Sequence, residues 1–180
     1  LGSAGNDYAK QIITGSDGDI YITGETWSTS LNQTDYWGGM HKGSVDIFLA
    51  KINSNGVIEW KNLIGSNVED YAHELIIGED NAIYLVGDAG GEVSGLDNKN
   101  GGRFISKFSA SGTQEWIKSY GDFNLSSFNS QPRNIGIDEN FFPSGIAFNT
   151  VDSYSHLIKI DSFLENIEKD LDTFSRQSHN

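Results

Sequence analysis

The sequence predicts an all-β chain made of three successive copies of a four-stranded antiparallel unit, the blade of a β-propeller. Three observations predict it. The same residues recur at fixed spacings along the chain, segments of alternating apolar and polar residues lie between turn sequences, and the whole chain has only two prolines, which suits uninterrupted strands. We expect a single propeller segment over residues 1–180, with blades at 7–65, 70–121 and 124–180.

The first two copies match at fixed spacings. The spacing is 63 positions up to a loop that is seven residues shorter in the second copy, and 56 positions after it. The matched pairs include Asp7 and Asp70, Gly15 and Gly78, Tyr21 and Tyr84, Gly24 and Gly87, Phe48 and Phe104, Lys51 and Lys107, Gly56 and Gly112, and Trp60 and Trp116. A third, weaker copy keeps Gly136, Gly145 and the run Leu157-Ile158-Lys159-Ile160, and we expect Ile167 to replace its tryptophan.

Each copy is expected to hold four strands joined by tight turns. Gly and Asn in the turn sequences at 16–18 and 53–56 tolerate positive φ, so neighbouring strands should pair antiparallel. In the first copy the strands are expected at Tyr8–Thr14, Asp19–Thr26, Asp46–Asn53 and Val57–Leu63. A sandwich of similar strands is the alternative, but it does not need the same landmarks in each unit.

The repeated pattern also resembles a known family. Asp-Gly-Asp-Ile-Tyr-Ile-Thr-Gly at 17–24 and Phe-Leu-Ala-Lys-Ile-Asn-Ser-Asn-Gly-Val-Ile-Glu-Trp at 48–60 are similar to the bacterial β-propeller repeat family of the SBBP type. The resemblance implies a propeller in a large secreted or surface-exposed protein, and little chemistry. The spacing from Gly56 to Trp60 is similar to that around the docking tryptophan of quinoprotein propellers, which locks each blade against its neighbour.

Residues that recur once per copy are expected to be structural. Trp60 and Trp116 should fill the space between adjacent sheets, with sugar stacking as the alternative. Asp7 and Asp70 should cap the turn between blades through hydrogen bonds with the backbone.

The third strand of each copy carries a lysine at the same position. These residues are Lys51, Lys107 and Lys159. We expect them to pair with a carboxylate on a strand, such as Glu59 or Glu115, and a catalytic lysine is the alternative.

Residues outside the repeat are the candidates for ligand binding, because binding sites in repeat folds lie on inserted loops. The longest loop, from Glu25 to Val45, mixes aromatic rings with small polar residues, which suits sugar or peptide binding. Its candidate ligand-binding residues are Trp27, Tyr36, Trp37 and His41. The alternative is that these rings fold back and cover the edge of the blade.

The matching loop of the second copy, from Asp88 to Gly102, is rich in oxygen ligands. Asp88, Glu92 and Asp97 are weak candidates for holding Ca²⁺. The loop lacks the spacing of a twelve-residue calcium loop, and we expect no other cofactor.

Composition excludes several functions. The net charge of −13 and the scattered Lys and Arg residues argue against nucleic acid as a partner. There is no apolar run long enough to insert into a membrane. The chain has no cysteine and no Gly-x-Ser-x-Gly motif, and its four histidines lack metal-ligand spacing, so we predict no catalytic residue.

These observations favour a non-enzymatic structural, binding or adhesion module of a secreted or cell-surface protein, with a glycan or surface polymer as the ligand of the loops. An enzyme with its active site at the propeller mouth, glycan-processing or quinoprotein-like, is the alternative. Because three blades do not close a ring, and Leu1-Gly2-Ser3 matches Ile64-Gly65-Ser66, we expect further blades or a second copy of the chain to complete the propeller.

Overall fold

The computed structural model shows an all-β chain. It describes residues 2–3, 5–27, 36–37, 39–78, 81–97, 99–121, 133–137, 143–149 and 154–159. The chain forms two compact units, Leu1–Asn124 and Leu125–Asn180. Every regular element in these described ranges is a strand, and they include no helix long and apolar enough to cross a membrane.

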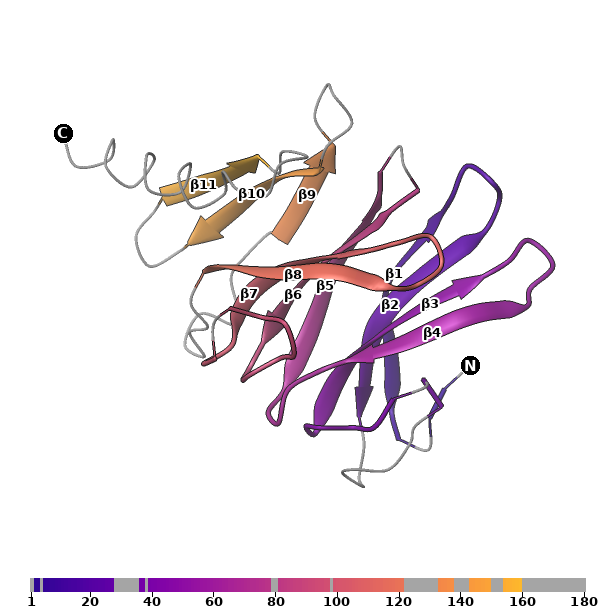
Figure 1. The fold of residues 1–180 in the computed structure, drawn as a ribbon, viewed down its shortest axis with the longest axis horizontal. Helices are drawn as coiled ribbons and strands as arrows, with labels where there is room; N and C mark the ends of the chain where they lie inside the picture. The colour runs from indigo at the N-terminus through magenta and orange to yellow at the C-terminus, as the bar shows by residue number, and fades with distance from the viewer. Residues whose placement is uncertain are drawn as a thin grey trace. The chain divides into compact units, whose positions relative to one another are not determined.

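The first unit begins with a four-stranded antiparallel sheet, called sheet 1 here (Figure 1). Its strands lie side by side in chain order: β1 (Asp7–Thr14), β2 (Ile20–Trp27), β3 (Val45–Ile52) and β4 (Ile58–Ile64). All four strands expected for the first copy agree with the observed strands to within one residue at both ends. The predicted strands are confirmed. The sequence predicts them well because turn residues mark both ends of each segment of alternating apolar and polar residues.

Sheet 2 repeats the same arrangement: β5 (Asp70–Ile77), β6 (Ile83–Ala89), β7 (Gly102–Phe108) and β8 (Gln114–Gly121). Both sheets also have a β-bulge at the same place in the first strand, at Lys10 in sheet 1 and His73 in sheet 2. The side-chain row that crosses three strands is equivalent as well: Tyr21, Lys51 and Trp60 in sheet 1, and Tyr84, Lys107 and Trp116 in sheet 2. The repeat in the sequence is therefore a repeat in structure, residue by residue.

The second unit contains a smaller antiparallel sheet. Its three described strands are β9 (Arg133–Ile137), β10 (Pro143–Asn149) and β11 (Tyr154–Lys159), in the order β11-β10-β9. The central strand, β10, pairs with β9 before it and β11 after it, so consecutive strands are neighbours as they are in sheets 1 and 2. Ile167, the expected replacement for the tryptophan, lies outside the described residues.

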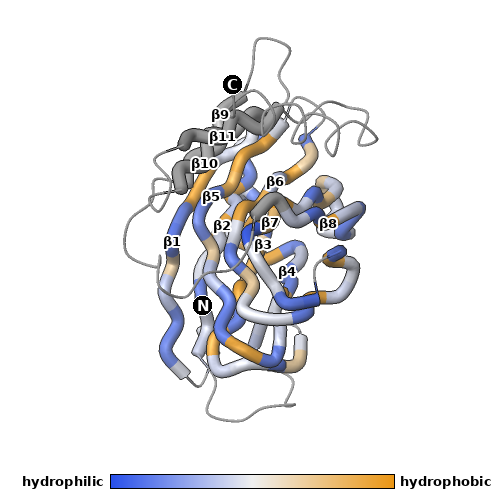
Figure 2. The backbone as a smooth tube through the Cα atoms, turned by 90° about the vertical axis from the view of Figure 1, so that its left-hand side faces the viewer, coloured by the Kyte–Doolittle hydropathy of each residue, from blue (hydrophilic) through white to orange (hydrophobic). Residues whose placement is uncertain are grey.

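Sheets 1 and 2 pack against each other through one hydrophobic cluster. It includes Tyr21 and Leu49 from sheet 1 and Leu75 and Leu85 from sheet 2. Every residue of β6 is buried, whereas β1, an edge strand, carries the hydrophobic colour over only a short stretch in Figure 2. Burying each such aliphatic side chain contributes about 2 kcal/mol, so this cluster is the main source of stability for the pair.

Trp60 closes the junction between the two sheets. Trp60 belongs to β4 and packs against the turn between β7 and β8. Its indole N–H donates a hydrogen bond of 3.0 Å to the carbonyl of Ala110 in that turn. The side-chain amide of Asn62 donates a bond of 2.7 Å to the carbonyl of Gly112 in the same turn. The expectation that Trp60 fills the space between adjacent sheets is confirmed.

Gly112 makes this contact feasible. Its φ of 84° lies in the left-handed region, and a Cβ atom on this residue would come within 2.5 Å of the Trp60 ring. Glycine satisfies both the turn conformation and the close approach of the ring.

Candidate functional site

The predicted ligand-binding residues divide into an exposed pair and a buried pair. Trp27 and Tyr36 are 40% and 37% exposed, whereas Trp37 and His41 are each 1% exposed. Residues 28–35 and 38 of the same loop lie outside the described part of the chain. The structure therefore offers only Trp27 and Tyr36, of these four, to a ligand.

Trp37 is held inside by two contacts. Its ring stacks on Phe48 with centroids 3.8 Å apart and an interplanar angle of 8°. Its indole N–H donates a hydrogen bond of 2.7 Å to the Asp7 carboxylate. Together with Ala50, Trp37 and Phe48 form a second hydrophobic cluster. For Trp37 the alternative prediction is confirmed: its ring folds back over the sheet instead of facing a ligand.

The exposed rings each have a different neighbour. Trp27, at the end of β2, meets Tyr8 of β1 edge to face at 6.4 Å, and Tyr8 is 52% exposed. Tyr36 lies beneath the ammonium group of Lys61, which is 3.9 Å from the ring centroid. Sequence reasoning missed Tyr8, because it belongs to the repeated Asp-Tyr-Ala sequence and was therefore taken as structural.

His41 belongs to a buried polar group rather than to the exposed surface. Its Nδ1 lies 3.1 Å from the carboxylate of Asp46, which is itself fully buried. Asp46 also accepts hydrogen bonds from the backbone N–H groups of Lys42 and Gly43. Burial raises the pKa of Asp46, and these hydrogen bonds and the nearby His41 oppose the rise. Asp46 was also missed; the only signal was its lack of a counterpart in the second copy, which has Gly102 there.

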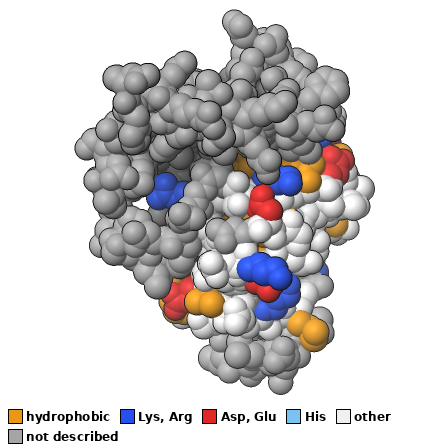
Figure 3. Space-filling view, turned by 60° about the vertical axis from the view of Figure 1, so that its left-hand side comes forward, with side chains coloured by type: hydrophobic (Ala, Val, Ile, Leu, Met, Phe, Trp, Pro, Cys, Tyr) orange, Lys and Arg blue, Asp and Glu red, His pale blue; other side chains and the backbone are white. Residues whose placement is uncertain are grey.

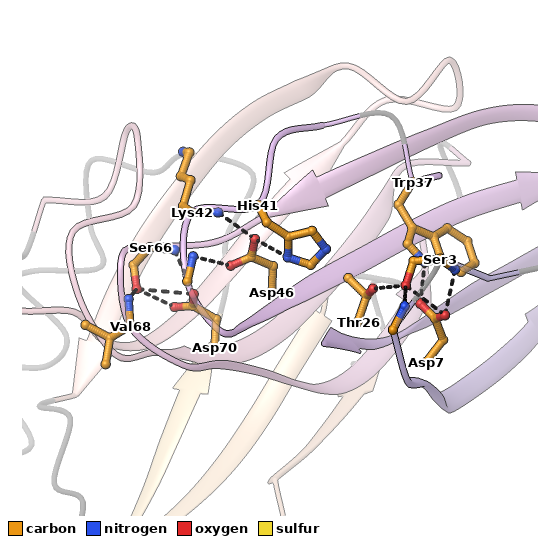
Figure 4. A network of polar contacts seen from close by, with 12 residues as sticks. Ser3, Asp7, Thr26, Trp37, His41, Lys42, Asp46, Ser66, Val68 and Asp70 are labelled. Atoms are coloured by element: carbon orange, nitrogen blue, oxygen red, sulfur yellow. Dashed lines mark hydrogen bonds and ion pairs between the residues drawn. The ribbon is translucent and has the colours of Figure 1, made fainter. Parts of the chain in front are cut away.

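Asp70 lies next to this group at the start of sheet 2 (Figure 4). Its carboxylate accepts hydrogen bonds from the backbone and hydroxyl of Ser66 and from the backbone N–H of Gly90. Burial raises the pKa of Asp70 to about 7, against the effect of these hydrogen bonds, and the charge of Asp46 adds to the rise. Asp46 and Asp70 therefore form a buried acidic pair whose oxygens are held by protein donors.

Asp7 repeats the Asp70 contacts at the start of sheet 1. It accepts hydrogen bonds of 2.7 Å from the backbone N–H of Ser3 and 2.7 Å from Trp37. Burial raises the pKa of Asp7, but the bonds from Trp37, Thr26 and Ser3 outweigh it and hold the pKa below its usual value. The expected capping role of Asp7 and Asp70 is confirmed, because each aspartate binds the backbone N–H of a serine four residues before it.

The three weak candidates for calcium binding do not come together as a metal site. Asp88 lies 3.0 Å from His73 and 3.8 Å from Arg103, and it is buried. Asp97 accepts two hydrogen bonds from Ser119. The third candidate, Glu92, is exposed. Within the described residues, no group of three or more His, Asp and Glu side chains is arranged to hold a metal ion.

The repeated lysines pair as expected. Lys51 lies 2.9 Å from Glu59 and 2.7 Å from Asp19, and Lys107 lies 3.2 Å from Glu115. The hydrogen bond with Asp19 is the main reason that the pKa of Lys51 is raised, and it lowers the pKa of Asp19. The prediction is confirmed for two copies, and the side chain of Lys159 lies outside the described residues.

A second repeated pair was not predicted. The bulge residue of each first strand meets an acid on the second strand: Lys10 and Glu25 are 3.2 Å apart, and His73 and Asp88 are 3.0 Å apart. Burial raises the pKa of Glu25, and Lys10 opposes the rise. The extra residue of a bulge re-aims its side chain, and a sequence pattern of simple alternation does not show where a bulge lies.

The surface carries charges of both signs. On the face shown in Figure 3, basic and acidic side chains lie beside one another and hydrophobic side chains lie at the margins of the described part. Neither sign covers a continuous area of that described face, which does not resemble a surface for a polyanion.

Comparison with known proteins adds no family. No family model matches the chain, and no curated protein matches it. The resemblance to bacterial β-propeller repeats stays a prediction that follows from the quoted motifs.

Proposed function

We propose that this chain is a non-enzymatic structural and binding module built from β-propeller blades. The observation that carries the proposal is the residue-by-residue repetition of sheets 1 and 2, joined by Trp60 on the turn of the next sheet. Stacked copies of one four-stranded meander support a propeller more than a sandwich, because a sandwich does not require equivalent bulges and junction residues in each sheet. Further blades, or a second copy of the chain, complete the ring.

The ligand of this module is a glycan or another surface polymer, bound at the exposed pair of rings Tyr8 and Trp27. Aromatic faces stack on sugar rings, and Tyr8 and Trp27, which meet edge to face, are 52% and 40% exposed. The family resemblance supports a secreted or cell-surface protein as the setting.

The test is a binding screen of the full chain against glycans and bacterial surface polymers, followed by calorimetry on any ligand found. Trp27→Ala and Tyr8→Ala should each weaken binding by at least about tenfold, as loss of an anchoring aromatic residue does. Val57→Ala is the matched control, since Val57 is 59% exposed but follows the β3–β4 turn, at the other end of the strands from Trp27. Full binding by the Trp27→Ala and Tyr8→Ala variants would contradict the ligand site.

A further inference from the structure

Sheet 1 has one face turned away from sheet 2. Along β1, Gln11 binds the backbone of Leu75 in sheet 2 and Ile13 packs on the shared core, so Ile12 between them points to the opposite face. There Ile12 is 63% exposed, although it is a large aliphatic residue. We call this the open face of sheet 1, defined by Ala9, Ile12 and Ile22. Its uncovered part is Ala9 and Ile12 on β1, because Ile22 packs on the cluster that Trp37 of the chain's own loop forms over β3.

The same positions in sheet 2 are completely covered. Ala72, Leu75 and Leu85 stand where the open face has Ala9, Ile12 and Ile22. They are 1%, 2% and 0% exposed, and they belong to the core that sheet 2 shares with sheet 1. The open face therefore has the composition of a face that receives another sheet.

The turn at one end of the open sheet shows the same difference. Gly56 has a φ of 79°, like Gly112, and each glycine bonds back to the first residue of its turn. A Cβ atom on Gly112 would collide with Trp60, whereas a Cβ atom on Gly56 meets no atom of the described residues within 4 Å. The turn of sheet 1 therefore has the same conformation as the turn that contacts Trp60 in sheet 2, but no described tryptophan packs on Gly56.

Trp116 of sheet 2 is the residue equivalent to Trp60, the tryptophan that packs on the turn at Gly112. Trp116 is held against Tyr84 at 6.1 Å, as Trp60 is held against Tyr21 at 6.1 Å. Lys118 stands at the position of Asn62, so a donor for the turn carbonyl is present in both sheets.

The sequence of the third copy has no glycine at the corresponding turn, where residues 161–166 read Asp-Ser-Phe-Leu-Glu-Asn. In sheet 2 a Cβ atom at the turn glycine, Gly112, would collide with Trp60, so the sequence of the third copy does not predict a tryptophan contact of this kind. Of the two glycines at this turn position, Gly112 contacts Trp60 and Gly56 contacts no described tryptophan.

We propose that the open face of sheet 1 and the turn at 53–57 bind sheet 2 of a second copy of this chain, with Trp116 on Gly56. This interface is head to tail: one copy contributes its open face and the other contributes Trp116, so successive copies can close into a ring. It depends on the repeat of the two sheets and not on the ligand site proposed above. Because each copy carries a net charge of −13, added salt should strengthen the association by screening repulsion.

The test is sedimentation velocity of the full chain over a wide concentration range. Wild type should self-associate, and Ile12→Arg and Trp116→Ala should each raise the dissociation constant by at least about tenfold. A mixture of these two variants should form heterodimers, because each keeps the half that the other has lost. Val68→Arg is the matched control, since Val68 is 42% exposed and lies between β4 and β5, at the other end of β4 from the turn at 53–57.

Gly56→Asn repeats the test without touching the core. Asparagine tolerates the positive φ, and its Cβ meets nothing in the single chain, so the variant should fold normally and fail to associate. A wild type that stays monomeric at the highest concentration would overturn the proposal. So would a mixture of Ile12→Arg and Trp116→Ala that stays monomeric, or a Val68→Arg variant that is impaired as much as Ile12→Arg.

Discussion

Sheets 1 and 2 share one local structure but have different surroundings. Strand order, bulge position and the Tyr-Lys-Trp row are the same in both. Equivalent residues nevertheless differ in burial and pKa, as Ile12 differs from Leu75 and Asp7 from Asp70. Local sequence therefore sets the geometry of each sheet, whereas the neighbouring sheet sets how much each position contributes to stability.

The largest expected difference concerns the two aspartates and pH. Burial raises the pKa of Asp70 from 3.8 to about 7, so between these values the folded chain holds a proton that the unfolded chain releases. The Asp70 contribution is complete below about pH 4 and is lost as pH rises to 7, by about 4 kcal/mol at most. Urea unfolding from pH 4 to 8 should show this loss in wild type and not in Asp70→Asn.

Asp7 should behave in the opposite way. Its pKa is held below the ordinary value, so its contribution is present above about pH 4 and is lost as pH falls below that. Asp7→Asn should therefore leave the loss between pH 4 and 7 unchanged. An Asp70→Asn variant with the pH dependence of wild type would contradict the assignment of this loss to Asp70.

The next largest difference concerns the aliphatic residues of the two first strands. Leu75→Ala empties part of the shared core and should lower the free energy of unfolding by about 3 kcal/mol. Ile12→Ala, at 63% exposure, should lower it by less than about 1 kcal/mol in dilute solution, where the copies are separate. Thermal or urea unfolding followed by circular dichroism measures both. Equal losses would mean that the two sheets are not packed as described.

The smallest difference concerns the lysines. The side chain of Lys51, which binds Asp19 and Glu59, is 10% exposed, whereas that of Lys107, which binds Glu115, is 20% exposed, so water screens the Lys51 pairs less. Lys51→Met should therefore destabilise the chain more than Lys107→Met, although by less than about 1 kcal/mol, because partly exposed ion pairs contribute little. The comparison of midpoints in urea at low and high salt checks this, and a larger effect for Lys107→Met would contradict it.

Much of the fold follows from local signals in the sequence. Turns with Gly and Asn delimit the strands to within one residue, and the recurrence of Asp7 and Lys51 predicts their contacts correctly. These features depend on residues close in sequence or in the neighbouring strand, which is why a pattern along the chain reveals them.

The candidate site is less accessible to such reasoning. Trp37 and His41 lie in a loop without periodicity, and their burial depends on Phe48 and Asp46, which are several residues further along the chain. Tyr8 is 52% exposed, whereas the equivalent Tyr71 is half-buried, although β1 and β5 are both edge strands; β5 differs in that it also packs against sheet 1. Burial and exposure of these rings are set by tertiary neighbours, which the sequence pattern does not specify.

The contact of Trp60 with the turn at Gly112 is the central claim, and a double-mutant cycle tests it directly. In wild type, Gly112→Ala should cost the strain of a positive φ plus the overlap with the ring, about 3 kcal/mol together. In the Trp60→Ala background only the strain of about 1 kcal/mol should remain, and Gly56→Ala should cost about 1 kcal/mol in both backgrounds. A Gly112→Ala cost that is the same with and without Trp60 would show that this tryptophan does not lock sheet 1 to sheet 2.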